Sequence, residues 1–225
     1  MAARVELLYN TLQVLIVFTS LTYGIIYWGE IKQHVYLKLL PIYTAVSLSL
    51  SLLWFFKKIN FPVILQHFFI PFEFFIFYNF FIKVLKNKKN YYILISLSTL
   101  FYISLIIIAA LLYSNQNKYL TVISFFNNKS LPELIVIENI FIGIPVLLYY
   151  ISLFNHPYIQ KISADPIFLV MTGILFCMVL STPVFVFQNI IVNNNRQVYQ
   201  YLYIINSIAY IVMHLFFIKA YKSIK

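Results

Sequence analysis

Apolar runs of about 20 residues, separated by short polar breaks, are the feature that most restricts the fold of this chain. A helix needs about that length to cross the hydrocarbon core of a bilayer. The runs are continuous rather than alternating between apolar and polar residues, which disfavours a β-barrel. We therefore predict a single all-α domain, residues 1–225, built as a polytopic membrane bundle of seven transmembrane helices. The predicted helices cover residues 7–28, 38–56, 62–84, 91–113, 134–154, 167–192 and 199–219.

The composition excludes a water-soluble domain. Apolar residues make up 62% of the chain and charged residues only 10%, whereas a soluble domain carries about 25% charged residues to face water. The net charge of +10 does not indicate nucleic acid, because the lysines lie in the short breaks between the apolar runs. Lysines in such breaks attract anionic lipid and set the topology. The expected partner is the lipid bilayer.

The distribution of Lys and Arg predicts the orientation. Ten of these residues fall on the side of the first, third and fifth connections and the C-terminus, and six fall on the opposite side. The positive-inside rule then places the N-terminus outside and the C-terminus in the cytoplasm, in a bacterial plasma membrane. The ten are Lys32, Lys38, Lys83, Lys86, Lys88, Lys89, Lys161, Lys219, Lys222 and Lys225, and the six are Arg4, Lys57, Lys58, Lys118, Lys129 and Arg196.

Glu73 is a carboxyl group near the centre of the third predicted helix, inside the aromatic run "PFEFFIFYNFF". An ionised acid at that depth costs about 2.5–3.5 kcal/mol. We therefore expect Glu73 to face the bundle interior and either to find a partner or to keep its proton. Gln66 and Phe77 share its helix face, at spacings of seven and four. The residue belongs either to a proton relay, ion site or ligand pocket, or to a structural hydrogen bond between helices.

The fifth and sixth predicted helices add a second set of polar residues. Glu138 and Asn139 precede Pro145 in "IENIFIGIPVLLYY", and Pro145 and Pro183 are expected to bend their helices. Glu138 could instead stabilise a helix N-terminus near water. In "LSTPVFVFQN", Ser181 and Thr182 could re-satisfy the backbone that the proline interrupts. Gln188 and Asn189 follow in the same helix.

The seventh predicted helix carries one polar face, which we expect to look inward. Its members are Tyr199, Tyr203, Asn206, Tyr210 and His214. Several helices offer polar groups at similar depth, which predicts a pocket open to the outside and closed below by Phe and Ile. Its outer-half members are Asn10, Gln13, Glu138, Gln188 and Asn189, and Asn206 and Glu73 lie somewhat deeper. The candidate ligand-binding or proton-relay residues are Glu73, Gln66, Glu138, Asn139, Gln188, Asn206 and Tyr210.

The sequence contains no motif of a known membrane enzyme, metal site or cofactor site. It has no HExxH, GxSxG, CxxC, Walker or dinucleotide-binding motif, and its four histidines lack metal-ligand spacing. Cys177 is the single cysteine and can form no intramolecular disulfide. A retinal protein needs a lysine in the middle of the last helix, where this chain has only Lys219 at the cytoplasmic end. We expect no enzyme, cofactor or metal.

The stretches "SADPIFLVMTGILFC", "FEFFIFYNFF" and "IENIFIGIPVLLYYISLF" resemble a group of small bacterial seven-helix membrane proteins. They are also similar to seven-helix sensory regions that precede some histidine kinases. The likeness rests on Asp165, Pro166 and Phe168 at the start of the sixth helix and on the Glu in helices three and five. It implies a sensor-like role with no assigned chemistry. Residues 1–225 include no kinase or regulator domain, so any signal would pass to a separate cytoplasmic partner.

Three functions follow as hypotheses. The first is a sensory or accessory protein that binds a small or lipidic ligand in its outer half and couples to a separate signalling partner. The second is a small proton-coupled transporter that uses Glu73. The third is a structural subunit of a larger membrane complex.

Overall fold

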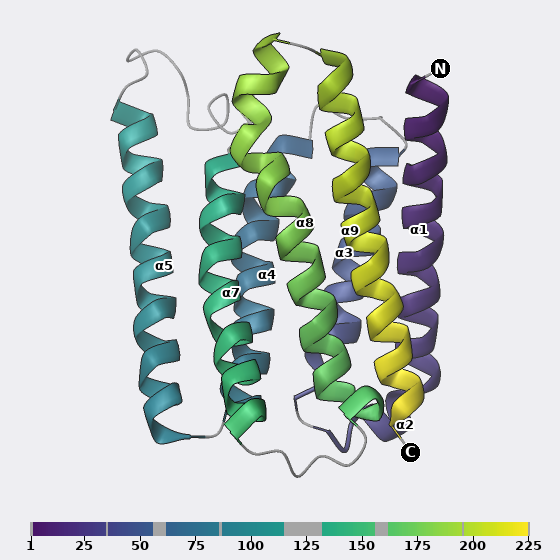
Figure 1. Ribbon diagram of the computed structural model, residues 1–225, viewed down its shortest axis with the longest axis vertical. Helices are drawn as coiled ribbons and strands as arrows, with labels where there is room; N and C mark the ends of the chain where they lie inside the picture. The colour runs from purple at the N-terminus through teal and green to yellow at the C-terminus, as the bar shows by residue number, and fades with distance from the viewer. Residues whose placement is uncertain are drawn as a thin grey trace.

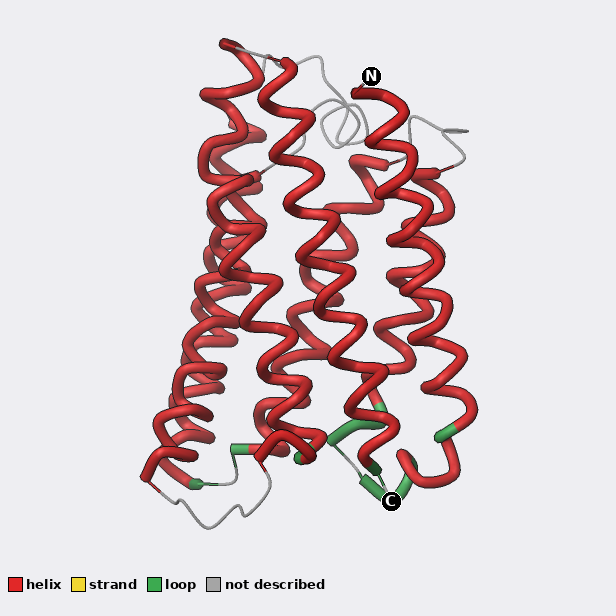
Figure 2. Tube along the Cα trace, turned by 45° about the vertical axis from the view of Figure 1, so that its right-hand side comes forward, coloured by secondary structure: helices red, strands yellow, loops and turns green. Residues whose placement is uncertain are grey.

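The computed structural model describes residues 2–34, 36–55, 62–85, 87–114, 132–155, 162–194 and 196–224. These residues form helices and connecting turns, and none of them lies in a strand (Figure 2). The helices are α1 (Ala2–Ile26), α2 (Trp28–Ile31), α3 (Leu39–Phe55), α4 (Pro62–Val84), α5 (Lys88–Ser114), α7 (Pro132–Asn155), the 3₁₀ turn η1 (Ile162–Ala164), α8 (Pro166–Asn194) and α9 (Arg196–Ser223).

The predicted helices match the observed ones closely, and the main difference lies near residue 28. A turn at Tyr27 separates α1 from the short helix α2, so the first apolar run does not form a single helix to its end. Several other helices begin earlier or end later than the apolar runs, as α5 and α9 do at both ends. The reason is that helical hydrogen bonding can continue into the polar flanks, whereas the prediction followed only apolar length.

The long helices run alternately in opposite directions. Figure 1 shows α1, α4, α7 and α9 descending and α3, α5 and α8 ascending, with the two termini at opposite ends of the bundle. Alternation is the expected consequence of short connections, which make consecutive helices antiparallel neighbours. The end that carries the C-terminus also carries α2, η1, the last turn of α4 and the first turn of α5.

Six helices close into a ring. Contacts join α1 to α3, α3 to α4, α4 to α7, α7 to α8, α8 to α9, and α9 back to α1. Helix α5 packs against α4 and α7 from outside this ring and stands at its edge (Figure 1). The six helices of the ring thus share its interior, and their side chains can meet there.

The described helices have the length and apolar composition of a multi-pass membrane protein. Five helical stretches are long and apolar enough to cross a bilayer, among the residues that the structure describes: Leu7–Ile26, Lys88–Ile107, Leu134–Asn155, Pro166–Phe187 and Ile204–Ser223. Leu39–Leu53 is a shorter apolar helix. Many large apolar side chains point outward, for example Phe68, Ile106 and Phe154, which are 71%, 69% and 80% exposed. Such a surface suits hydrocarbon rather than water.

Aromatic stacking and close backbone approach hold the helices together. The rings of Tyr78, Phe74 and Phe101 form a continuous stack, with centroid distances of 4.0 Å and 3.7 Å, that joins α4 to α5. At Gly173 of α8, a Cβ atom would lie 2.9 Å from Phe216 Cβ and 3.1 Å from the Met213 carbonyl oxygen of α9. Small residues at such crossings let membrane helices approach closely, which favours their association by van der Waals packing.

Candidate functional site

Glu73 faces the interior of the helix ring, as its sequence position predicted. Its side chain is 9% exposed, and its Oε1 accepts a hydrogen bond of 2.9 Å from the Tyr43 hydroxyl of α3. Tyr43 is itself fully buried between the rings of Phe77 and His214, at centroid distances of 4.9 Å and 6.1 Å. The bond therefore ties α3 to α4 deep in the bundle and holds one carboxylate oxygen in a fixed direction.

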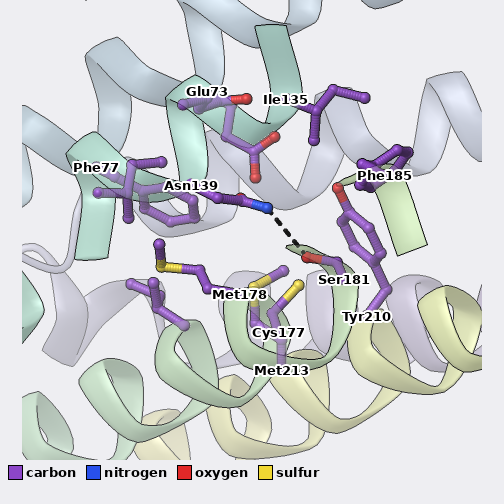
Figure 3. A pocket seen from close by; sticks show the side chains of 13 residues that line it. Glu73, Phe77, Ile135, Asn139, Cys177, Met178, Ser181, Phe185, Tyr210 and Met213 are labelled. Carbon is purple, nitrogen blue, oxygen red and sulfur yellow. Dashed lines mark hydrogen bonds between the residues drawn. The ribbon is translucent and has the colours of Figure 1, made fainter. Parts of the chain in front are cut away.

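A small cavity opens beside Glu73 and brings four helices together. Polar groups reach it from α4 through Glu73, from α7 through Glu138 and Asn139, from α8 through Ser181, and from α9 through Tyr210. Figure 3 shows Glu73, Asn139, Ser181 and Tyr210 around this space. Apolar residues complete the wall: Phe77, Ile135, Ile142, Ile174, Cys177, Met178, Phe185 and Met213. The cavity thus gathers two carboxyl groups from adjacent helices.

Glu138 is buried rather than placed near water at a helix end. Only 3% of its surface is exposed, and its Oε1 has no hydrogen-bond partner among the described residues. This position argues against a role in stabilising the N-terminus of α7, which begins at Pro132, six residues earlier. A buried polar atom without a partner costs about 1–3 kcal/mol, and more when it carries charge.

Asn139 fixes α7 against α8 at the level of the cavity. Its amide nitrogen donates to Ser181 Oγ at 3.3 Å, a bond drawn in Figure 3, and to Thr182 Oγ1 at 3.0 Å. The Thr182 hydroxyl in turn donates to the Met178 carbonyl one turn earlier, at 2.7 Å. These contacts lie immediately before Pro183 and set the rotation of α7, which places the adjacent Glu138 toward the cavity.

Pro145 leaves a backbone carbonyl of α7 without its helical donor, and α4 supplies one. Proline has no N–H, so the carbonyl four residues earlier, that of Phe141, loses its usual partner. The buried hydroxyl of Tyr78 donates to that carbonyl at 3.0 Å. A side chain from a neighbouring helix therefore replaces the missing bond, as expected for a proline inside a membrane helix. The Tyr78 bond thus attaches α7 to α4, and the Asn139 bonds attach it to α8.

Tyr210 and His214 of the predicted polar face of α9 turn inward, and the side chains of Tyr199 and Tyr203 lie outside the described residues. Tyr210 lines the cavity, and His214 is fully buried one turn further on. Neither ring nitrogen of His214 has a hydrogen-bond partner within the described part of the chain. Asn206 is half-buried, its Oδ1 is likewise unpartnered among those residues, and it does not line the cavity.

The structure does not describe the side chains of two of the predicted site residues. Gln66 belongs to α4 and Gln188 to α8, and only their backbone is described. Sequence reasoning also missed a participant. Tyr43 was not selected, although its neighbours Thr44 and Ser47 mark a polar face on α3, and all three are buried. In the sequence, the available indication was that Thr44 and Ser47 follow Tyr43 at spacings of one and four residues, and that a spacing of four places Ser47 on the same helix face as Tyr43.

The cavity is much smaller than a typical site for a small organic ligand. It offers about 20 Å³ to water-sized molecules, whereas sites for small organic ligands measure about 300–1,000 Å³. In this conformation the space suits a proton carrier or a water rather than a lipidic ligand. Among the described residues, no cluster of three or more His, Cys, Asp or Glu side chains could hold a metal ion.

A second polar cluster closes the end of the bundle near the C-terminus. Asp165 caps α8, because its Oδ1 accepts the Ile167 N–H at 3.0 Å, and the Tyr149 hydroxyl lies 3.4 Å from its Oδ2. His34 Nδ1 lies 2.9 Å from the Tyr36 hydroxyl. Burial, and then the nearby Asp165 carboxylate, raise the pKa of Tyr36. The Asp-Pro start of the sixth predicted helix is thus a helix cap.

No family model, curated protein or solved structure matches this chain. The likeness to bacterial seven-helix proteins and sensory regions therefore stays a prediction from short sequence stretches. The function is therefore inferred from the fold and the candidate site.

Proposed function

We propose that α1, α3, α4, α5, α7, α8 and α9 each cross the bilayer, with the N-terminus outside and the C-terminus in the cytoplasm of a bacterial cell. The end of the bundle that holds the C-terminus carries exposed lysines on several elements, including Lys32, Lys88, Lys89, Lys219 and Lys222. Basic residues favour the cytoplasmic side of a membrane protein. This distribution supports the orientation.

Within this membrane protein, we propose a small proton-coupled transporter whose proton site is the pair Glu73 and Glu138. The observation that carries the proposal is that both carboxyl groups are buried in the ring and line one cavity. Carboxyl groups inside membrane bundles are rare and typically belong to proton or ion pathways. Two of them facing one small space, with hydroxyl groups beside them, form a site that can take up and release a proton.

A purely structural role explains the pair Glu73 and Glu138 less completely than it explains the other buried polar groups. The Tyr43 bond alone would suit an acid that only joins two helices. Glu138, however, brings a second carboxyl to the same cavity from α7, with its Oε1 unpartnered in the described structure. A scaffold gains nothing from that oxygen, since an apolar side chain of similar volume would avoid its desolvation cost.

The test uses protons as the probe, because the transported substrate is unidentified. The full chain is reconstituted in liposomes on a solid-supported membrane, and the transient current that follows a pH jump is recorded. We expect a transient from proton binding in the wild type and its loss in Glu73→Gln and in Glu138→Gln. Glu30→Gln is the matched control, since Glu30 is an exposed acid on α2 at the end of the bundle.

The proposal is wrong if the double variant Glu73→Gln/Glu138→Gln keeps the full transient while remaining folded. An absent transient in the wild type would contradict it as well and would favour the structural subunit. Infrared spectra recorded across about pH 3 to 9, a range that includes the ordinary Asp and Glu titrations, would identify the acid involved. The difference between wild type and each Gln variant assigns the carboxyl band.

A sensory or accessory protein is the second candidate, favoured by the exposed lysines at the predicted cytoplasmic end, which could contact an acidic partner. Cys177 separates the candidates, because it lines the cavity and is the only thiol in the chain. Membrane-impermeant thiol reagents are applied to oriented vesicles from each side. A transporter should expose Cys177 to both sides in turn, and a sensor only to the outside. A structural subunit should protect it from both.

A further inference from the structure

The cavity between Glu73 and Glu138 has the volume and the polar lining of a site for one water molecule. A cavity needs about 10–15 Å³ to hold a water, and the water needs two to four polar partners. This one offers about 20 Å³, with Glu73, Glu138, Ser181 and Tyr210 on its wall. We propose that a single bound water bridges the two carboxyl groups and carries a proton between them.

The position of Glu138 gives this inference a second, independent basis. Its side chain is 97% buried, and its Oε1 lacks a hydrogen-bond partner among the described residues although the residue lines the cavity. Buried waters characteristically satisfy such groups, with about three hydrogen bonds each. A water in the cavity would remove the desolvation cost at Glu138 without any movement of α7.

The surrounding hydrogen bonds restrict how that water can be oriented. The Tyr43 hydroxyl already occupies Glu73 Oε1. The Ser181 hydroxyl oxygen accepts from Asn139, so its own hydrogen is available to the cavity as a donor. The Ser181 hydroxyl as donor and the carboxyl oxygens of Glu73 and Glu138 as acceptors hold the water between the two acids. Proton transfer through one intervening water is an accepted geometry for acid–base groups.

The transfer balances without any other reactant. The carboxyl of one glutamic acid gives its proton to the water oxygen, while the water gives one of its own protons to the carboxylate of the other residue. The O–H bond of the first acid breaks, the O–H bond of the second forms, and the water is regenerated. Net charge stays constant, and the proton has moved from α4 to α7 or in the reverse direction.

The experiment fills the cavity while leaving both acids in place. Because it rests on the proposed proton site, it uses the same pH-jump transient, with Cys177→Leu as the filling variant and Val179→Leu, which adds bulk on α8 outside the cavity, as its control. We expect Cys177→Leu to slow the transient by about tenfold or more in protein that remains folded. Val179→Leu should keep the wild-type rate, because Val179 is 60% exposed and does not line the cavity.

The outcomes separate the two proposals. A folded Cys177→Leu protein with the wild-type rate overturns the water bridge and leaves the proton site intact. A wild-type protein with no transient overturns the proton site itself. If Cys177→Leu does not fold, a high-resolution experimental structure of the wild type decides. Water density within hydrogen-bond distance of both carboxyl groups supports the bridge, and a dry cavity overturns it.

Discussion

Replacing Gly173 by alanine should separate α8 from α9 and lower the stability of the whole bundle. The added Cβ would lie 2.9 Å from Phe216 Cβ, 3.1 Å from the Met213 carbonyl oxygen and 3.4 Å from Met213 Cα. Two of these atoms belong to the backbone of α9 and the third is fixed to it, so no flexible side chain can move aside. Relief requires a shift of one helix against the other.

The magnitude follows from two opposing effects. Overpacking of a close-packed interior costs about 1–3 kcal/mol, and rigid neighbours place this site in the upper part of that range. Alanine regains roughly 1 kcal/mol over glycine in a helix interior. The net loss is therefore about 1–2 kcal/mol, or roughly 2–8 °C in melting temperature for a chain of this length.

The assay can use a reporter that the chain already contains. Cys177 is buried and free, so a dye that fluoresces on reaction with a thiol follows thermal unfolding in detergent. Gly29→Ala is the matched control, since a Cβ there meets nothing within 4 Å, and it should leave the melting temperature unchanged or raise it. Gly143→Ala meets only the terminal methyl of Met178, at 3.3 Å, and should be close to neutral. A Gly173→Ala protein that melts at or above the wild-type temperature refutes the packing argument.

Three further predictions concern the ties of α7 and the orientation. Tyr78→Phe should lower the free energy of unfolding by about 0.6–1.5 kcal/mol. The loss should be smaller in a Pro145→Ala background, because the restored backbone N–H can donate to the Phe141 carbonyl. A double-mutant cycle of melting temperatures measures the difference, and equal losses in both backgrounds would contradict the prediction. Asn139→Ala should destabilise by a similar amount and weaken the pH-jump transient, whereas Asn79→Ala, which removes only a bond within α4, should leave the transient unchanged. In a Cys177→Ala background, Lys89→Cys and Lys222→Cys should react with an impermeant thiol reagent from the cytoplasmic side, and Val198→Cys should react from the outside. Reaction of all three variants from one side would contradict the proposed topology.

Apolar length was sufficient to predict most of the helices, because bilayer thickness sets a physical minimum for each. The run 62–84 coincides with α4, and 38–56 with α3 to within one residue at each end. The break at Tyr27 was not predictable in this way. Tyr27 and Trp28 are themselves apolar and extend the run, so apolar length places the end of the first helix two residues later than the structure does.

The candidate site could be predicted one residue at a time but not as an assembly. Burial cost placed Glu73 inside the bundle, and helical spacing turned Tyr210 and His214 inward, as the structure has them. Spacing within one helix says nothing about which face of another helix lies opposite. The meeting of Glu73 with Glu138, and the bond from Tyr43, depend on helix order in the ring, which the sequence does not encode locally.

The proline positions indicate which part of the ring could move around the acid pair. Among the described helices, α4, α7 and α8 contain interior prolines, Pro71, Pro145 and Pro183, and these three helices supply both carboxyl groups and the Ser181 hydroxyl. Helix α9 has no proline within Arg196–Ser223 and packs extensively on α8 and α1, and Gly173 allows its close approach to α8. Proline weakens a helix locally because one backbone bond is missing. Bending at these prolines would therefore reshape the cavity between Glu73 and Glu138 while α1 and α9 hold the rest of the bundle in place.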